Sequence, residues 1–284
     1  MKRFPLLRCV AIALYVLLVL TGGYTQAKAD ELYTPTSWQA GKDVVWVPTP
    51  QDLAEKMLDM AQVTASDFVM DLGSGDGRLV IAAARRGATA LGIEYNPDLV
   101  ELARRAAAKA GVSARAAFEK ADIFESDFSR ATVVTLFLQP QLNLRLRQRI
   151  LDMKPGTRIV SNNFGMADWQ PDKTTHLEDY AGGSSAYTPR DQDSDPIWRT
   201  AHLWIVPAKV DGTWKLHNGQ ISFIQEFQNI TGKLTLGNED TKLTGKLDGD
   251  KISFNAGGTA YAGTVSDNTI SGTRAGGGAW DASR

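Results

Sequence analysis

The stretch Val69-Met-Asp-Leu-Gly-Ser-Gly-Asp-Gly-Arg-Leu79 decides the fold of this chain. An apolar run ends in Asp71, a glycine-rich turn follows, and a helical pattern begins at once. Glycine adopts positive φ without strain and lets a ligand approach the backbone, while the N-terminus of a helix presents free N–H groups. The stretch therefore predicts a strand, a ligand-binding turn and a helix. The binding residues of the predicted turn are Gly73, Ser74, Gly75 and Gly77.

Three acids indicate which ligand the turn binds. The third glycine comes one residue earlier than in the G-x-G-x-x-G of dinucleotide sites, and Asp71 precedes the first glycine, where a carboxylate suits an ammonium better than a phosphate. Glu94 ends the second predicted strand, where an acid accepts both ribose hydroxyls, and Asp122 follows the third strand, where it accepts the adenine amine. Taken singly, Asp71 could be an ordinary turn residue and Glu94 an ordinary surface acid. Together the three predict a site for S-adenosylmethionine.

Strand-like and helix-like segments alternate around this turn. Such alternation is typical of parallel strands joined by crossover helices, so we expect an α/β fold with a Rossmann-like, doubly wound sheet. A loop over 181–196 precedes the last strand and is interpreted as either a lid or a surface excursion. The predicted strands are 68–72, 89–93, 115–120, 133–138, 158–161 and 202–206, and the predicted helices are 51–62, 77–86, 97–110 and 141–153.

The composition changes after residue 207, where half of the 26 glycines lie. Short alternating runs recur there between turn signals such as Gly237-Asn238 and Asp248-Gly249. We therefore predict a small all-β domain, an antiparallel meander that closes into a barrel or a sandwich. Its only histidine is His217, and no nucleophile has a base at recognisable spacing, so we interpret it as an accessory or partner-binding domain.

Composition and charge exclude several classes of protein. The 284 residues are 43% hydrophobic and 22% charged, which excludes a disordered chain or a many-span membrane protein. The net charge of −1 without a basic run argues against a nucleic-acid partner. The only cysteine is Cys9, which excludes a thiolate metal cluster, and His176 and His202 are too far apart in sequence to suggest a metal pair. We expect no metal site.

The N-terminus has the pattern of a secretory signal. Lys2, Arg3 and Arg8 precede an apolar run over 10–20, which is shorter than a membrane-spanning helix, and the small residues of Ala27-Lys-Ala29 follow it. We expect export to the periplasm or the exterior, with membrane association through an uncleaved anchor as the alternative. The predicted domains are a signal peptide over 1–29, an S-adenosylmethionine-binding α/β domain over 30–207 and a β domain over 208–284.

A family resemblance covers roughly residues 45–171 and not the tail. Five stretches carry it: Trp46–Pro50, Asp71–Ala84, Gly92–Pro97, Leu136–Pro140 and Pro155–Ser161. They resemble the class I, seven-strand S-adenosylmethionine-dependent methyltransferases, and within these the small protein-lysine methyltransferases that act on ATP-synthase c subunits and adenine-nucleotide carriers. More distantly they are similar to the non-SET histone-lysine methyltransferases. The resemblance implies that Val47, Pro48 and Thr49 cover the cofactor.

A lysine acceptor must lose its proton before it is methylated. With a pKa near 10.4, this costs roughly 4–5 kcal/mol at pH 7, and an apolar pocket lowers that pKa. We predict that Phe137, Gln139 and Pro140 line this pocket, with the Gln139 carbonyl accepting from the amine. Other amino-methylating enzymes carry Asp/Asn-Pro-Pro-aromatic where this chain has Leu138-Gln-Pro-Gln141, which leaves the acceptor atom open.

The prediction is a protein-lysine N-methyltransferase with a protein or small-molecule acceptor. A small-molecule O- or N-methyltransferase is one alternative. Another is an exported nucleoside-binding protein without catalysis, because export would separate an enzyme from the cytosolic cofactor pool. Asn162, Asn163 and Phe164 follow the fifth predicted strand on the same side of the sheet, and no role is assigned to them.

Overall fold

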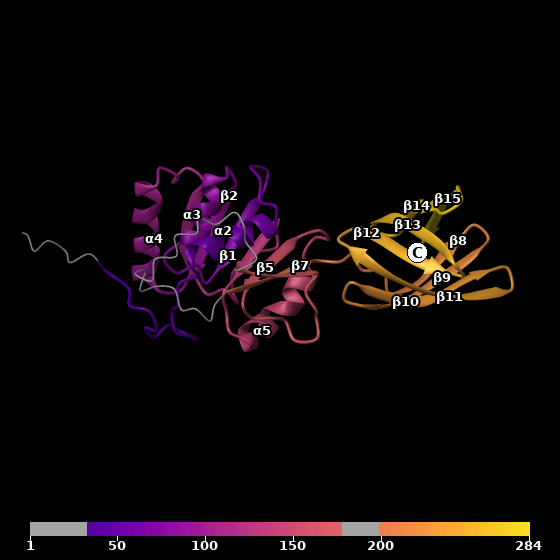
Figure 1. Cartoon of the computed structure of the whole chain (residues 1–284), viewed down its shortest axis with the longest axis horizontal. Coiled ribbons are helices and arrows are strands. Elements are labelled where there is room, and N and C mark those ends of the chain that lie inside the picture. Colours follow the sequence, from indigo (N-terminus) through magenta and orange to yellow (C-terminus); the bar gives the residue numbers. More distant parts are fainter. Residues whose placement is uncertain (1–32, 178–198) are drawn as a thin grey trace, which may run out of the picture. The chain divides into compact units, whose positions relative to one another are not determined.

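The structure, a computed structural model, describes residues 33–177 and 199–284. The predicted signal peptide and the loop over 181–196 lie outside these described residues. The described chain forms a seven-stranded sheet with helices, followed by a closed β-barrel (Figure 1). Within the described ranges, no helix is both long enough and apolar enough to cross a membrane.

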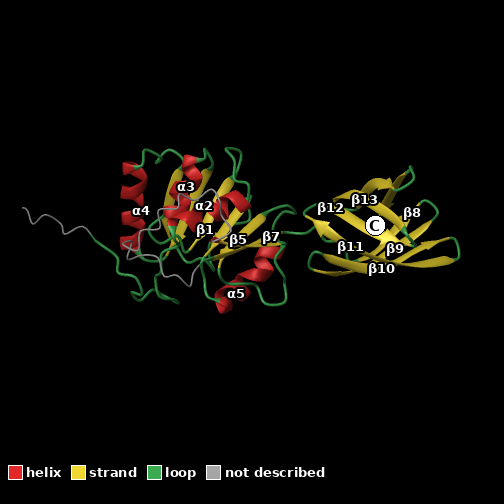
Figure 2. Cartoon of the chain, in the orientation of Figure 1, coloured by secondary structure: helices red, strands yellow, loops and turns green. Residues whose placement is uncertain are grey.

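The sheet has the strand order β3-β2-β1-β4-β5-β7-β6. Figure 2 labels strands β1, β5 and β7 of this sheet beside the helices. Strands β1 to β5 pair in parallel, whereas β7 is antiparallel to β5 and β6. The α/β fold class is therefore confirmed. The strands are β1 Phe68–Leu72, β2 Thr89–Glu94, β3 Ala116–Lys120, β4 Val133–Leu136, β5 Arg158–Asn162, β6 Lys173–His176 and β7 Thr200–Ile205, and the helices are α2 Gln51–Met60, α3 Arg78–Arg85, α4 Pro97–Lys109 and α5 Pro140–Leu151.

Apolar side chains cover both faces of the sheet. In β1, Val69 belongs to a core cluster with α2, α3 and α4, whereas Met70 belongs to a second cluster with α5. This alternation follows from the two-residue period of a strand. Each fully buried large apolar side chain contributes about 1.5–3 kcal/mol to the stability of the fold. Helix α4 begins where the sequence predicts it, because the Asn96 side chain accepts the Asp98 N–H at 2.9 Å and Pro97 occupies the first turn.

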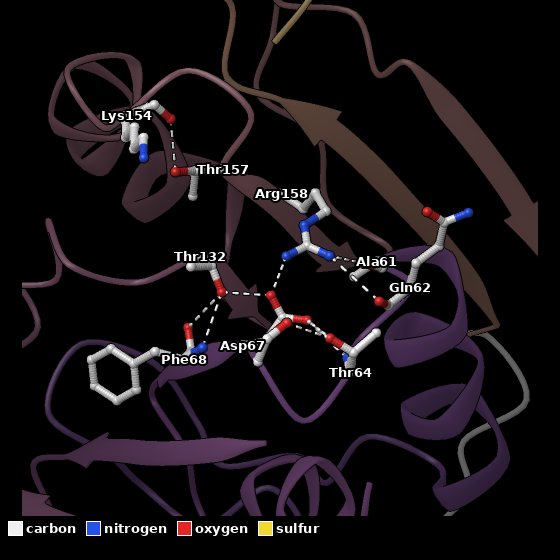
Figure 3. Close-up of polar contacts among 10 residues, drawn as sticks. Ala61, Gln62, Thr64, Asp67, Phe68, Thr132, Lys154, Thr157 and Arg158 are labelled. Atoms are coloured by element: carbon white, nitrogen blue, oxygen red, sulfur yellow. Dashed lines mark hydrogen bonds and ion pairs between the residues drawn. The ribbon is translucent and has the colours of Figure 1, made fainter. Parts of the chain in front are cut away.

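A buried carboxylate ties together the strands at the edge where they begin. Asp67 is only 7% exposed, forms an ion pair with Arg158, and accepts the Thr132 hydroxyl at 2.7 Å and the Thr64 N–H at 2.8 Å (Figure 3). Burial alone would raise the pKa of Asp67, but these partners lower it below its usual value. The network joins the start of β1 to β4 and β5 and leaves the opposite edge for ligands.

The C-terminal strands form a closed antiparallel barrel in the order β10-β11-β12-β13-β14-β15-β8-β9, which confirms the all-β prediction. The turn at Gly237-Asn238 lies where the sequence predicts it, whereas the next turn is Gly249-Asp250, one residue later than expected. The predicted boundary after residue 207 falls between β7 and β8 and stays a prediction. The strands are β8 Gly212–Leu216, β9 Gly219–Glu226, β10 Asn229–Leu236, β11 Glu239–Asp248, β12 Lys251–Ala256, β13 Thr259–Ser266, β14 Thr269–Arg274 and β15 Ala279–Ser283.

Trp169 is a core residue with partners on both sides of that boundary. It is fully buried, and its indole N–H donates to the Gln228 side chain at 3.0 Å. The ring of Phe227 stacks on it with centroids 5.8 Å apart, and the indole N–H of Trp204 donates to its carbonyl at 2.8 Å. The turn between β9 and β10 therefore shields this tryptophan from water.

Candidate cofactor and acceptor site

The turn after β1 requires glycine for both conformation and space. Gly73, Gly75 and Gly77 have φ of 84°, 52° and 81°. A Cβ on Gly75 would lie 2.5 Å from the indole nitrogen of Trp46, and one on Gly77 would lie 2.5 Å from the Phe118 ring. Both distances are shorter than any allowed contact. The turn is therefore packed from both sides, and α3 starts directly after it.

Glu94 holds the same turn from the end of β2. Its Oε2 accepts the N–H of Gly75 and its Oε1 accepts the N–H of Asn96, both at 2.9 Å. A carboxylate has about four acceptor positions, so each oxygen keeps capacity for a further donor. The carboxylate is therefore oriented before a ligand arrives, and two ribose hydroxyls fit the remaining positions.

Asp71 is a carboxylate that lacks solvent. It is 3% exposed, and its Oδ1 accepts the Thr135 hydroxyl at 2.6 Å. Burial raises the pKa of Asp71 to about 7, the carboxylates of Glu94 and Asp76 add to the rise, and the Thr135 hydrogen bond opposes it. A cationic ligand group would supply the missing counter-charge. This environment fits the ammonium of an amino-acid moiety.

A segment ahead of α2, here called the strap (residues 38–49), lies over the turn. Its two arms pair through the N–H of Trp38 to the Trp46 carbonyl at 2.8 Å and the N–H of Trp46 to the Gln39 carbonyl at 2.9 Å. Between them, the ammonium of Lys42 pairs with Asp122 and lies 4.9 Å from the centroid of the Tyr95 ring. The hydrogen bond from Lys42 lowers the pKa of Asp122. The predicted bond from Asp122 to an adenine amine stays a prediction.

One cavity joins most of the residues that the sequence predicts. Gly77 lies beneath the turn instead, against Phe118 and Ala103, and Gln139 and Pro140 are exposed residues outside the cavity lining. The cavity has the features that S-adenosylmethionine requires. These are glycines that let the ligand approach the backbone, three acids at successive strand ends and a strap that covers the ligand. The predicted residues that line the cavity are Val47, Pro48, Thr49, Asp71, Gly73, Ser74, Gly75, Glu94, Asp122 and Phe137.

The ends of β4 and β5 meet beside this cavity. The rings of Phe137 and Phe164 stack with centroids 6.2 Å apart and an interplanar angle of 23°. Asn163 has φ of 59°, and the side chain of Asn143 on α5 donates to the carbonyls of Phe164 and Gly165 at 3.3 and 3.2 Å. The buried amide of Asn143 thus holds the loop after β5 against the end of β4.

The Gln139 carbonyl, which is predicted to accept from the amine, lies at the start of α5. This oxygen accepts the N–H groups of Leu142 and Asn143 at 2.9 and 3.2 Å, because Gln139 is the N-cap of α5. Both lone pairs are committed to the first turn of the helix. An amine would have to share this oxygen with the helix, and the parts predicted for Phe137, Gln139 and Pro140 stay predictions.

Sequence reasoning missed several residues of the site. Trp46 and Arg78 lie within quoted motifs, so membership of those motifs was the available signal. Arg78 pairs with Asp76 and donates to the Thr49 carbonyl at 2.6 Å, which fixes the strap's end. Tyr95 lies within the quoted stretch Gly92–Pro97 and directly follows Glu94, whereas nothing local marked Lys42 or Asn143. Within the described ranges, no group of three or more histidine, cysteine or acidic residues is placed to hold a metal.

Comparison with known proteins identifies the family. Residues 71–173 match the model of the ANTKMT methyltransferase domain. A protein-lysine N-methyltransferase of Saccharolobus islandicus is 41% identical over 139 residues, which are 48% of this chain and 86% of that protein. This chain belongs to the protein-lysine methyltransferase family. As a member of that family, it is an S-adenosylmethionine-dependent methyltransferase, and the resemblance noted in its motifs is confirmed.

Two further relatives bear on the acceptor. The lysine N-methyltransferase of the ATP-synthase c subunit from Mus musculus is 37% identical over 131 residues, and the match spans 46% of this chain and 53% of that protein. The methyltransferase therefore matches about half the length of that relative. The crystal structure of an RNA methyltransferase from Salinibacter ruber in complex with S-adenosyl-L-homocysteine has 42% identity and a TM-score of 0.50, and the match covers 58% of this chain and 96% of that one.

Proposed function

We propose that this methyltransferase transfers the methyl group of S-adenosylmethionine to the ε-amino group of lysine in a protein. The observation that carries the proposal is the 41% identity to a protein-lysine N-methyltransferase across 86% of its length. The site supports it with a carboxylate at each of three adjacent strand ends. Asp71 would bind the ammonium of the cofactor, Glu94 its ribose, and Asp122 its adenine.

The strand order supports an acceptor position at the other end of the cavity. The cofactor's adenine, ribose and amino-acid subsites would lie at the ends of β3, β2 and β1, in that order. The ends of β4 and β5 are then the neighbours of the methyl group that is transferred. Phe137 and Phe164 provide an apolar environment there, which lowers the pKa of a lysine amine and favours its neutral form. The proton leaves to solvent before transfer.

The bound cofactor supplies an electrophilic methyl group on sulfur. Transfer is an in-line displacement in which the amine lone pair forms the N–C bond while the S–C bond breaks. Positioning and the exclusion of water provide most of the rate enhancement for such a step. The strap would exclude water, and the aromatic pair would orient the amine, so a separate catalytic base is not required.

The test is an acceptor assay with the full chain. Purified protein and tritiated S-adenosylmethionine are incubated with protein and RNA fractions of the native host, and labelled proteins are mapped by mass spectrometry. We expect label on lysine that is sensitive to protease and resistant to ribonuclease. Asp281→Asn, an exposed change on β15, serves as the control variant that retains activity. Label confined to RNA or to small molecules would refute the protein-lysine proposal.

A second candidate acceptor is RNA, because the Salinibacter ruber relative is described as an RNA methyltransferase. The net charge of −1 and the lack of a basic run favour a protein acceptor instead, since RNA binding draws on lysine and arginine contacts to phosphates. The two candidates separate in the same assay, because ribonuclease treatment removes label from RNA and leaves methyl-lysine unchanged.

We also propose that residues 1–29 form a cleaved export signal and that residues 30–207 and 208–284 are separate domains. The export signal is supported by the order of residues at the N-terminus, where basic residues are followed by an apolar run and then by small residues. Cell fractionation with N-terminal sequencing tests it, and we expect a mature chain that begins at Asp30. A cytosolic chain that begins at Met1 would refute export, and a membrane-bound chain with an intact N-terminus would establish the anchor.

A further inference from the structure

Asn162 has a buried amide oxygen that the fold does not use. The residue ends β5 and is fully buried, and its Nδ2 donates to the Thr49 hydroxyl at 3.3 Å. Its Oδ1 has no hydrogen-bond partner among the described residues. A buried polar atom without a partner lowers stability, so it calls for an explanation outside the fold itself.

The position of Asn162 connects this oxygen with the site. Its partner Thr49 lines the cofactor cavity, as does Phe137, and Phe137 stacks on Phe164, two residues after Asn162. The amide therefore lies where the strap meets the ends of β4 and β5. Asn162 itself is not in the cavity lining but contacts it through Thr49, on the side that the cofactor subsites on β1, β2 and β3 leave for the acceptor.

We infer that Asn162 binds the acceptor amine: its Oδ1 accepts one N–H of the lysine ε-amine, while Phe137 and Phe164 contact the methylene chain. The inference rests on the proposed function and adds a residue to its acceptor subsite. A neutral amide oxygen orients the amine without strongly favouring the ammonium form. A carboxylate at the same place would stabilise the ammonium, whose lone pair is not available for methyl transfer.

Two substitutions separate this role from a structural one. Asn162→Leu keeps the volume and removes the oxygen, whereas Asn162→Asp keeps an oxygen and adds a charge. Asn255→Leu, an exposed change on β12, is the matched control. The probes are S-adenosyl-L-homocysteine for the cofactor subsite and n-butylamine, which has the shape of the lysine side chain, for the acceptor subsite.

Binding of n-butylamine is measured by calorimetry on full chains saturated with S-adenosyl-L-homocysteine, and transfer is measured with tritiated S-adenosylmethionine. For Asn162→Leu we expect a melting temperature no lower than that of the wild type, an unchanged affinity for S-adenosyl-L-homocysteine and a loss of amine affinity of about 10-fold or more. For Asn162→Asp we expect tighter amine binding together with a lower kcat. A residue with only a structural role would not make amine binding tighter while it lowers kcat.

Equal amine affinity in the wild type and in Asn162→Leu would overturn the inference, and so would a wild type that does not bind n-butylamine. A fall in affinity for S-adenosyl-L-homocysteine as large as the fall for the amine would also overturn it, because it would show a general loss of structure. The proposed function is decided separately by lysine label in the acceptor assay.

Discussion

The affinity for S-adenosyl-L-homocysteine should rise with pH up to about 7 and then become constant, because Asp71 must lose a proton to bind the ligand's ammonium. Burial raises the pKa of Asp71 in the free protein to about 7, whereas an ammonium at hydrogen-bond distance would lower it again in the complex. Below pH 7 the ligand therefore competes with a proton. Above pH 7 the carboxylate is already ionised, and no proton is released.

The magnitude follows from that pKa. Between the bound and free pKa values, the dissociation constant should grow about tenfold for each pH unit, so that pH 5 costs about 100-fold relative to pH 8. Near pH 6 binding should release roughly 0.9 proton, as expected for a group that is about 90% protonated at one unit below its pKa. Stability of the free protein changes in the opposite direction: the folded-state pKa is raised, so stability falls as pH rises from about 4 to 7.

Calorimetry from pH 5 to pH 8, in two buffers with different heats of ionisation, measures both the affinity and the released proton. Asp71→Asn should bind weakly and without pH dependence. Thr135→Val removes the hydrogen bond that lowers this pKa, so its transition should move to higher pH. Asp281→Asn should behave as the wild type. A wild-type affinity that is constant over this range, with no proton released, would refute the reasoning.

Three further changes test the cofactor site and the domain boundary. Gly75→Val should abolish measurable binding of S-adenosyl-L-homocysteine, because its Cβ alone would lie 2.5 Å from an indole nitrogen of the strap, whereas Gly276→Val, with open space around its Cβ, should retain binding. Glu94→Gln should weaken binding about 30- to 150-fold by calorimetry, and wild-type affinity would remove Glu94 from the site. A chain that ends at Pro207 should still bind the nucleoside, but with a lower melting temperature, because truncation exposes Trp169. Loss of cooperative unfolding in that chain would contradict separate domains.

Local chemistry explains why much of the site was predictable. The strand, glycine turn and helix at Asp71 are adjacent in sequence, so their order already specifies a binding turn. Glu94 and Asp122 were predictable for a different reason: the carboxyl ends of parallel strands share one edge of a sheet. Once the alternation of strands and helices was recognised, the fold itself brought these acids together.

The residues that were missed depend on contacts between distant parts of the chain. Lys42 meets Asp122 across 80 positions, which no local pattern records. The edge strand β6 has the sequence Lys-Thr-Thr-His and is largely exposed, so it lacks the apolar alternation that marks a strand. The N-cap role of Gln139 was not predicted because the sequence placed the helix start at Gln141, whereas α5 begins at Pro140.

The three acids of the site differ in how the protein satisfies them, and this difference selects the ligand. Lys42 neutralises Asp122, and backbone N–H groups hold Glu94. For Asp71, the described residues provide the Thr135 hydroxyl and no ion pair. A pyrophosphate on the glycine turn would add negative charge beside this buried carboxylate, whereas an ammonium relieves its desolvation. We therefore expect this turn, whose third glycine also comes one residue earlier than in dinucleotide sites, to select against a pyrophosphate chiefly through the uncompensated carboxylate of Asp71.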